Sequence, residues 1–134
     1  MGLKKKILIV DDEEDFCFLI KKNLESTGEF EVFVAYNGID GFCLARVEKP
    51  DLILLDIIMP DIGGSDVVHR LKADEHTKNI PVIFLTAVIT PKETGKGRVR
   101  KIGSYNYIAK PIDTDRLIAY INDTLAGKDI TSAE

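Results

Sequence analysis

Short, mainly apolar segments alternate with amphipathic segments along the whole chain. The apolar segments are rich in Ile, Val, Leu and aromatic residues, and they span residues 5–10, 30–35, 51–55, 80–85 and 105–108. Segments of this length and composition are typical of β-strands that are covered on both faces of a sheet. The pattern therefore predicts five buried strands.

The segments between these strands have the apolar spacing of amphipathic helices, and they span residues 13–26, 38–48, 65–73 and 113–125. Asn37 stands directly before the helix 38–48, and Asp113 is the first residue of the helix 113–125. Both side chains are favoured as N-caps at these positions. Gly28 follows the helix 13–26 and Pro50 follows the helix 38–48, at positions where helices commonly end. The sequence therefore predicts four helices, three of them with a start or stop signal.

A regular strand–helix alternation predicts an α/β fold, with a doubly wound parallel sheet, right-handed crossovers and helices on both faces. For five strands we expect the flavodoxin-like order 2-1-3-4-5. The chain has 134 residues, so we expect a single domain over 1–126, with 127–134 as a C-terminal tail or the start of a linker. Residues 90–104 contain Pro91, Gly95 and Gly97 where a further helix is due, which predicts a short, late or mobile helix.

Four of the predicted strands end on a polar side chain. Asp11 and Asp12 follow the first strand, Asp56 the third, Thr86 the fourth and Lys110 the fifth. The carboxyl ends of parallel strands meet at one edge of the sheet, which is where open α/β sheets bind their ligands. We therefore expect these five side chains to form one pocket.

Three clustered carboxylates repel one another unless a cation lies between them, and oxygen-only ligation is the pattern of Mg²⁺. We expect Asp12 and Asp56 to bind the ion directly and Asp11 to act through water. Lys110 could pair with a phosphoryl oxygen, and the Thr86 hydroxyl could donate to another. An aspartate held in this way can act as a nucleophile and become an aspartyl phosphate.

Composition narrows the class of protein. The formal net charge is −4, which disfavours nucleic-acid binding, and the basic residues of 92–101 are interpreted as a solvated surface. No apolar run approaches the length that crosses a membrane, and Cys17 and Cys43 lack metal or redox spacing. We therefore expect a cytoplasmic protein with free thiols and no membrane partner.

The strand ends and their surroundings resemble the response-regulator receiver family, the CheY-like domains. The resemblance covers about residues 4–125, as a stand-alone receiver or as part of a longer regulator. Its motifs are Ile7-Leu8-Ile9-Val10-Asp11-Asp12-Glu13, Asp51-Leu52-Ile53-Leu54-Leu55-Asp56-Ile57-Ile58-Met59-Pro60 with Gly64, Pro81-Val82-Ile83-Phe84-Leu85-Thr86-Ala87 and Tyr107-Ile108-Ala109-Lys110-Pro111.

The resemblance implies a phosphoacceptor switch of a two-component system rather than a metabolic enzyme. Asp56 would take a phosphoryl group from a phosphohistidine on a histidine kinase or histidine phosphotransfer protein. Mg²⁺ would be held by Asp12, Asp56 and the backbone carbonyl of Ile58. Thr86 and Tyr107 would form the switch pair.

The resemblance also implies features outside this set. The Lys110-Pro111 peptide would be cis. The face near the fourth and fifth strands would bind an output protein, whose identity the sequence does not give. Apart from the resemblance, we expect a monomer or a phosphorylation-dependent dimer.

Three positions depart from the family pattern. Gly63 replaces the usual acidic or polar residue before Gly64, which predicts a looser loop. Ile58 and Val88, two residues beyond Asp56 and Thr86, are bulky and apolar where the family lines the path of the hydrolytic water. We therefore expect slow self-dephosphorylation.

Two other functions fit parts of the pattern. The first is a phosphorylation-independent interaction module, although all five pocket residues are intact. The second is a Mg²⁺-dependent phosphohydrolase with Asp56 as nucleophile, but Ile58 stands where such enzymes usually carry a second acid. A flavin-binding flavodoxin is disfavoured because the acidic residues 11–15 would repel the phosphate of the cofactor.

Overall fold

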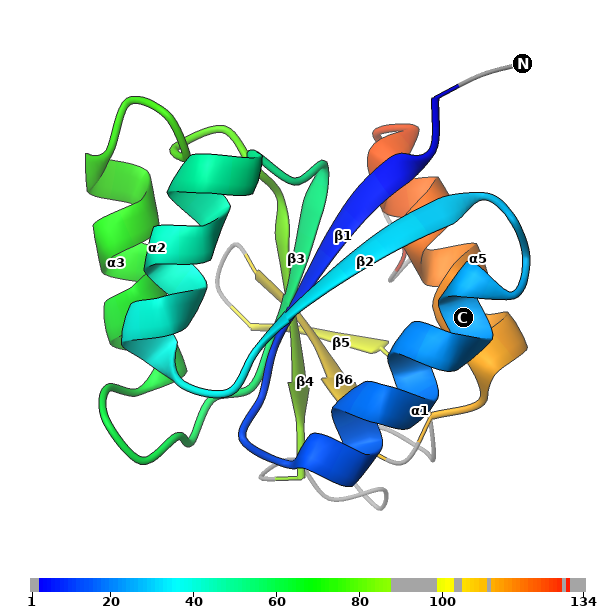
Figure 1. Ribbon diagram of the computed structural model, residues 1–134, viewed down its shortest axis with the longest axis horizontal. Helices are drawn as coiled ribbons and strands as arrows, with labels where there is room; N and C mark the ends of the chain where they lie inside the picture. The colour runs from blue at the N-terminus through cyan, green and yellow to red at the C-terminus, as the bar shows by residue number, and fades with distance from the viewer. Residues whose placement is uncertain (1–2, 88–98, 103–104, 111, 129, 131–134) are drawn as a thin grey trace.

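The computed structural model describes residues 3–87, 99–102, 105–110, 112–128 and 130. Strands and helices follow one another along the chain (Figure 1). Their order is β1 (Lys5–Val10), α1 (Glu14–Glu25), β2 (Phe30–Ala35), α2 (Gly38–Glu48), β3 (Leu52–Leu55), α3 (Gly64–Ala73), β4 (Val82–Thr86), β5 (Val99–Ile102), β6 (Tyr105–Ala109) and α5 (Thr114–Leu125).

Five of the strands form a parallel sheet in the order β2-β1-β3-β4-β6, which confirms the predicted order 2-1-3-4-5 because β6 is the fifth predicted strand. In Figure 1 the helices α2 and α3 lie on one side of this sheet, and α1 and α5 lie on the other. The arrowheads of β4 and β6 point the same way in Figure 1, as expected for a parallel pair. The doubly wound α/β prediction is therefore correct.

The sequence did not predict β5. This strand extends the sheet beyond β6 and pairs with it antiparallel, with Val99 opposite Ile108 and Ile102 opposite Tyr105. Gly103 and Ser104, which separate the two strands in sequence, are residue types that two-residue hairpin connections favour. The short or late helix expected within 90–104 falls largely on residues 88–98, which lie outside the described residues.

The sheet separates two apolar cores. The core under α1 and α5 contains the fully buried Ile7, Ile9 and Leu54. The core under α2 and α3 contains Leu8, Val10 and other residues that alternate with them along the same strands. Such alternation follows from the two-residue period of a strand, and it explains why the central strands are apolar throughout. Ile130, beyond the last helix, is also buried in the core under α1 and α5.

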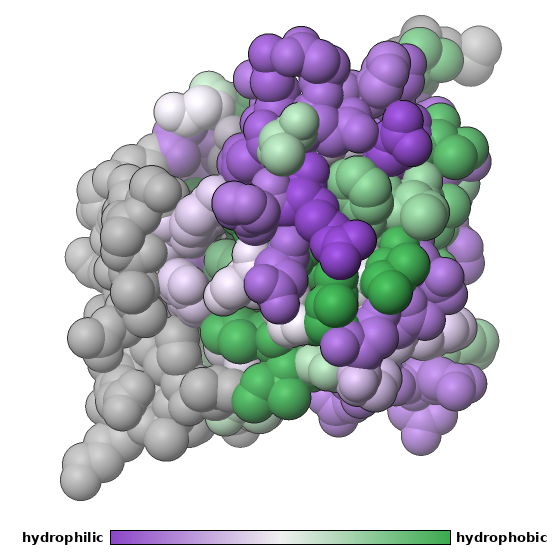
Figure 2. All heavy atoms as spheres, turned by 90° about the vertical axis from the view of Figure 1, so that its left-hand side faces the viewer, coloured by the Kyte–Doolittle hydropathy of each residue, from purple (hydrophilic) through white to green (hydrophobic). Residues whose placement is uncertain are grey.

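Side chains fix the helix ends as the sequence predicted for two helices. The Asn37 side chain accepts a hydrogen bond from the N–H of Asp40 at 2.8 Å, and the Asp113 side chain accepts one from the N–H of Arg116 at 3.2 Å. These bonds satisfy backbone donors that have no partner within the first helical turn. The outer face of α2 and α3 is mostly hydrophilic, with small apolar patches between the polar side chains (Figure 2).

The edge of the sheet at β2 is covered by two side chains from α1. The Glu25 carboxylate accepts a hydrogen bond from the N–H of Val32 at 3.0 Å, and the Lys21 ammonium donates to its carbonyl at 2.7 Å. Lys21 and Glu25 also contact each other at 3.5 Å. The backbone of Val32 thus has partners on the side that faces away from β1.

Candidate functional site

The carboxylates of Asp11, Asp12 and Asp56 meet at the carboxyl edge of the sheet, with one oxygen of each within 4.8 Å of the others. The strands place them there directly, because Asp11 and Asp12 follow β1 and Asp56 follows the neighbouring β3. The N–H of Asp56 donates to the carbonyl of Val10 at 2.9 Å, which joins the two strand ends. Asp11 and Asp56 are buried, and Asp12 is exposed.

Lys110, at the end of β6, reaches into this cluster. Its ammonium lies 2.6 Å from an Asp11 carboxylate oxygen and 3.8 Å from an oxygen of Asp56. Its backbone N–H donates to the carbonyl of Thr86 at 3.0 Å, so the ends of β4 and β6 are held together. The fold therefore brings together the residues that the sequence placed at four separate strand ends.

Two further residues hold the Lys110 ammonium, and the sequence analysis assigned a role at the site to neither of them. Glu13 accepts a hydrogen bond from it at 2.7 Å, and the ring of Phe16 lies below it with 4.4 Å from Nζ to the ring centroid. A cation over an aromatic face is attracted by the ring quadrupole. The Lys110 ammonium is thus oriented from three sides by residues of the chain itself.

Burial dominates the electrostatics of the two inner carboxylates. Desolvation raises the pKa of Asp11, and the hydrogen bonds from Lys110 and from the N–H of Glu13 only partly oppose it. Desolvation likewise raises the pKa of Asp56, against the nearby charge of Lys110. For Lys110, desolvation lowers the pKa, but the hydrogen bonds to Asp11 and Glu13 outweigh it and the pKa is raised. Burial therefore disfavours the charged form of both inner carboxylates, and Lys110 offsets this effect only in part.

The loop from Asp56 to Gly64 forms one wall of the site. An oxygen of Asp56 accepts a hydrogen bond from the N–H of Ile57 at 2.8 Å, and the carbonyl of Ile57 accepts one from the N–H of Gly64 at 2.6 Å. Met59 is buried in the core under α2 and α3, whereas the side chain of Ile58 is 64% exposed. The loop is therefore closed at its two ends and anchored in its middle.

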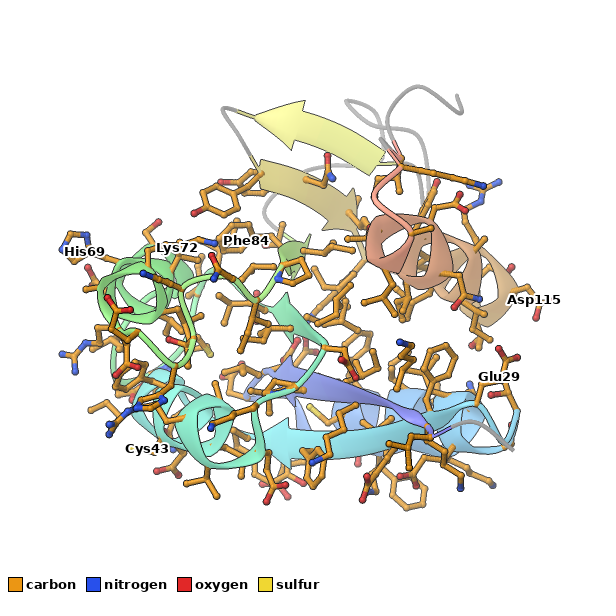
Figure 3. All side chains as sticks on the ribbon, turned by 90° about the horizontal axis from the view of Figure 1, so that it is seen from above. Glu29, Cys43, His69, Lys72, Phe84 and Asp115 are labelled. Carbon is orange, nitrogen blue, oxygen red and sulfur yellow. The ribbon has the colours of Figure 1, made fainter. Side chains whose placement is uncertain are left out.

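The two predicted switch residues lie on neighbouring strands. Thr86 is fully buried at the end of β4. Tyr107 is half-buried on β6, and its ring stacks on Phe84 with centroids 4.7 Å apart and an interplanar angle of 15°. Figure 3 shows Phe84 between the sheet and α3, so Tyr107 packs on that side of the sheet. Pro111, predicted to follow a cis peptide bond, and Val88 lie outside the described residues.

The remaining reactive side chains lie apart from this cluster, with one exception. The thiol of Cys17 is buried and lies 3.3 Å from the backbone carbonyl of Asp11, and desolvation raises its pKa to about 12. Cys43 is exposed on α2, and His69 is exposed on the outer side of α3 (Figure 3). Within the described residues, no helix is long and apolar enough to cross a membrane.

The donor set of the acidic cluster suits a hard divalent cation. All its ligand atoms are carboxylate oxygens, and the exposure of Asp12 leaves room for water in the coordination shell. Mg²⁺ is typically bound by one or two carboxylates together with water and phosphate oxygens. Thus Asp12 and Asp56 are suited to direct contact with such an ion, and Asp11 is already engaged by Lys110.

An acidic triad, a lysine and a threonine at the carboxyl edge of this sheet define a receiver domain. The family model for the response regulator receiver domain matches residues 7–122, and the chain belongs to that family. Receiver domains are signalling proteins that take phosphate from histidine kinases or phosphotransfer proteins and bind Mg²⁺ at an acidic site. The matched residues make up most of the 134-residue chain.

Particular relatives agree with this assignment. Protein PilH of Pseudomonas aeruginosa is 41% identical over 122 residues, which cover 91% of this chain and 98% of PilH. A response regulator from Desulfuromonas acetoxidans has a crystal structure with a TM-score of 0.74 and 30% identity, covering 91% of this chain and 97% of that one.

A third relative is a receiver domain of a sensor histidine kinase from Pseudomonas aeruginosa PAO1. Its crystal structure contains a magnesium ion coordinated in the active site cleft. It is 25% identical to this chain, with a TM-score of 0.75, and the match covers 92% of this chain and 99% of that one.

Proposed function

We propose that this protein is a phosphoacceptor switch in which Asp56 takes a phosphoryl group from a phosphohistidine of a kinase or phosphotransfer protein. The observation that carries the proposal is the meeting of Asp11, Asp12 and Asp56 within 4.8 Å, with the Lys110 ammonium 3.8 Å from Asp56. An oxygen of Asp56 would form the new O–P bond as the P–N bond breaks, and the histidine nitrogen would keep the electron pair and take up a proton.

Each residue of the site has a part in this transfer. Asp12, Asp56 and the carbonyl of Ile58 would hold Mg²⁺, and Asp11 would contact it through water. The ion would neutralise the phosphoryl oxygens that the carboxylates would otherwise repel. Lys110 would pair with one phosphoryl oxygen, and Thr86 would donate its hydroxyl to another. Most of the catalytic effect then comes from positioning and charge stabilisation.

Phosphorylation would also change the output surface. The Thr86 hydroxyl would move toward the phosphoryl group, and the Tyr107 ring would leave its present stacking on Phe84 and turn inward. Two states of this surface, with different affinities for an output protein, would then be populated according to the charge at Asp56. We place this switch in the cytoplasm, as a monomer or a phosphorylation-dependent dimer.

Incubation with acetyl phosphate tests the proposal. We expect intact-mass spectrometry to show one phosphoryl adduct that requires Mg²⁺ and is lost in Asp56→Asn. Asp66→Asn, a change of the exposed aspartate in the first turn of α3, is the matched control and should be modified as readily as wild type. A folded wild-type protein that takes up no phosphoryl group would instead favour a phosphorylation-independent interaction module.

Ile58 is expected to slow the loss of the phosphoryl group. Its exposed apolar side chain stands two residues beyond Asp56 and offers no polar atom to an attacking water. We expect phosphorylated Ile58→Asn to decay several-fold faster than wild type, because the amide could bind and orient water. Val47→Asn, which changes an exposed apolar residue of α2, serves as the control. Decay of the Ile58 variant at or below the wild-type rate would contradict this explanation.

A further inference from the structure

Asp61 joins the loop of the candidate site to the start of α2. Its two carboxylate oxygens accept hydrogen bonds from the N–H groups of Gly38 and Ile39, each at 2.8 Å. These are the first two residues of α2, whose backbone N–H groups have no acceptor within the helix. Although desolvation acts in the opposite direction, these hydrogen bonds keep the pKa of Asp61 below its ordinary value. Asp61 is therefore an anionic cap contributed by a segment 22 residues away.

The two segments are also in close steric contact. A Cβ atom at Gly38 would lie 2.5 Å from the side chain of Ile62 and 3.1 Å from its backbone carbonyl. The start of α2 thus rests directly on the loop, at a distance that only glycine permits. A movement of this part of the loop requires a movement of the helix end, or the loss of both hydrogen bonds from Asp61.

Between Met59 and α3 the loop is also restrained by Ile62, which is partly buried against the core under α2 and α3. Gly63 is the residue before α3, and it offers no side chain to cap that helix. The hydrogen bond between Gly64 and Ile57 closes the loop, and Met59 anchors it in the core. Between these points, Asp61 supplies side-chain hydrogen bonds from the loop to another element. Gly63 at this position predicts a looser loop, and the hydrogen bonds of Asp61 restrain that loop.

We infer that Asp61 is a positioning residue for metal binding and phosphorylation, because it fixes the loop that carries Asp56 and the Ile58 carbonyl against the start of α2. This inference rests on the proposed function. Asp61 lies three positions from Ile58, which is too close in the chain for one to move freely while the other is fixed. Without the anchor the Ile58 carbonyl samples more orientations, and Mg²⁺ must restrict them when it binds.

The inference makes Mg²⁺ affinity the informative quantity. Loss of a partner that directly orients a metal ligand typically lowers metal affinity about 10- to 100-fold. Asp61 acts through the backbone of a short loop, so we expect a smaller effect, a decrease of roughly 3- to 10-fold in Asp61→Ala. Asp61→Asn retains one acceptor and loses the charge, and it should lie between wild type and the alanine variant.

Isothermal titration of Mg²⁺ into full-length wild type, Asp61→Asn, Asp61→Ala and Asp66→Asn tests this order. Asp66→Asn removes the same charge from an exposed position in the first turn of α3, and we expect its affinity to equal that of wild type. The titrations are made well below the melting temperature of each variant, with circular dichroism to verify folding. Hydrogen exchange of the Gly38 and Ile39 amides reports whether the helix end has been released.

The outcomes separate a positioning role from a purely structural one. Weaker Mg²⁺ binding together with faster exchange of the two amides supports the inference. Faster exchange with unchanged Mg²⁺ affinity overturns it, because Asp61 would then only cap α2. A wild type that binds no Mg²⁺ also overturns it. The proposed function is tested separately, by the adduct on Asp56, and it stands if that adduct forms while the Asp61 variants bind Mg²⁺ normally.

Discussion

Lys110→Ala is expected to lose about 3 kcal/mol of unfolding free energy at pH 7 without Mg²⁺, because a buried charge pair that loses one partner typically costs about 3–5 kcal/mol. The ammonium is 2.6 Å from Asp11 and 2.7 Å from Glu13, and only 9% of the Lys110 side chain is exposed. Its removal leaves the inner carboxylates of Asp11 and Asp56 without a cation. The variant should also accept a phosphoryl group much more slowly.

The loss of unfolding free energy in Lys110→Ala should depend on pH, and the raised pKa values of Asp11 and Asp56 determine the direction of this dependence. The pKa values of Asp11 and Asp56 are raised in the folded protein, so the folded state holds more protons than the unfolded state just above pH 3.8. Stability therefore falls as the pH rises through the window from 3.8 to the folded pKa values, and it stays lower above them. Without Lys110 the pKa values of Asp11 and Asp56 rise further, so the pH range over which stability falls becomes wider. The difference in unfolding free energy between wild type and Lys110→Ala therefore grows toward neutral pH.

Urea unfolding in a chelator at pH 4 and pH 7 measures this difference. Lys78→Ala is the matched control, because the Lys78 ammonium pairs with the exposed Glu75 at 3.0 Å and such pairs contribute at most about 1 kcal/mol. We expect the control to lose little at either pH. An equal loss of stability in Lys110→Ala at both pH values would show that packing against Phe16, rather than charge, accounts for the effect.

Gly64→Ala is expected to displace the loop that carries Asp56. A Cβ atom at this position would lie 2.6 Å from the carbonyl oxygen of Asp56 and 3.0 Å from the Cα of Ile57. Both are backbone atoms, so the clash cannot be relieved by a change of rotamer. Overpacking typically costs about 1–3 kcal/mol, and we expect a value near the upper end together with markedly weaker Mg²⁺ binding and phosphorylation.

Gly63→Ala provides a control at the neighbouring position. A Cβ atom there would approach the carbonyl oxygen of Ile57 at 3.3 Å, a contact that a small adjustment relieves. We expect the free energy of unfolding of this variant to lie within about 1 kcal/mol of the wild-type value, and we expect the variant to form the phosphoryl adduct. If the two alanine variants lost stability and phosphorylation equally, the close contacts of a Cβ atom at position 64 would not explain why this position is a glycine.

The sequence predicted the sheet well because each parallel strand has a local signature. The predicted bounds of β1 and β2 agree with the structure, since each is an apolar run that ends at a polar or turn residue. The N-caps of α2 and α5 were predicted for the same reason, because Asn37 and Asp113 act within their own first turns. The pocket followed from topology, since parallel strands that end on polar residues bring those residues to one edge.

What the sequence did not predict depends on distant neighbours. β5 has two basic residues between Val99 and Ile102, and such a segment becomes a strand only because β6 is available to pair with it. The contact of Lys110 with Glu13 joins residues 97 positions apart, and no local pattern signals it. The same holds for the hydrogen bonds of Asp61 with the N–H groups of Gly38 and Ile39, which lie 23 and 22 positions away. These contacts are set by the packing of the whole chain.

The pair of side chains on the outer edge of β2 has a consequence for how the protein behaves in concentrated solution. An open sheet edge is a template on which a strand of another molecule can add, and this is a common route to self-association. At Val32 the backbone carbonyl and N–H already have hydrogen-bond partners, which are Lys21 and Glu25 of the same chain. A strand from a second molecule would have to displace both side chains before it could pair there, so the sheet resists growth on this side.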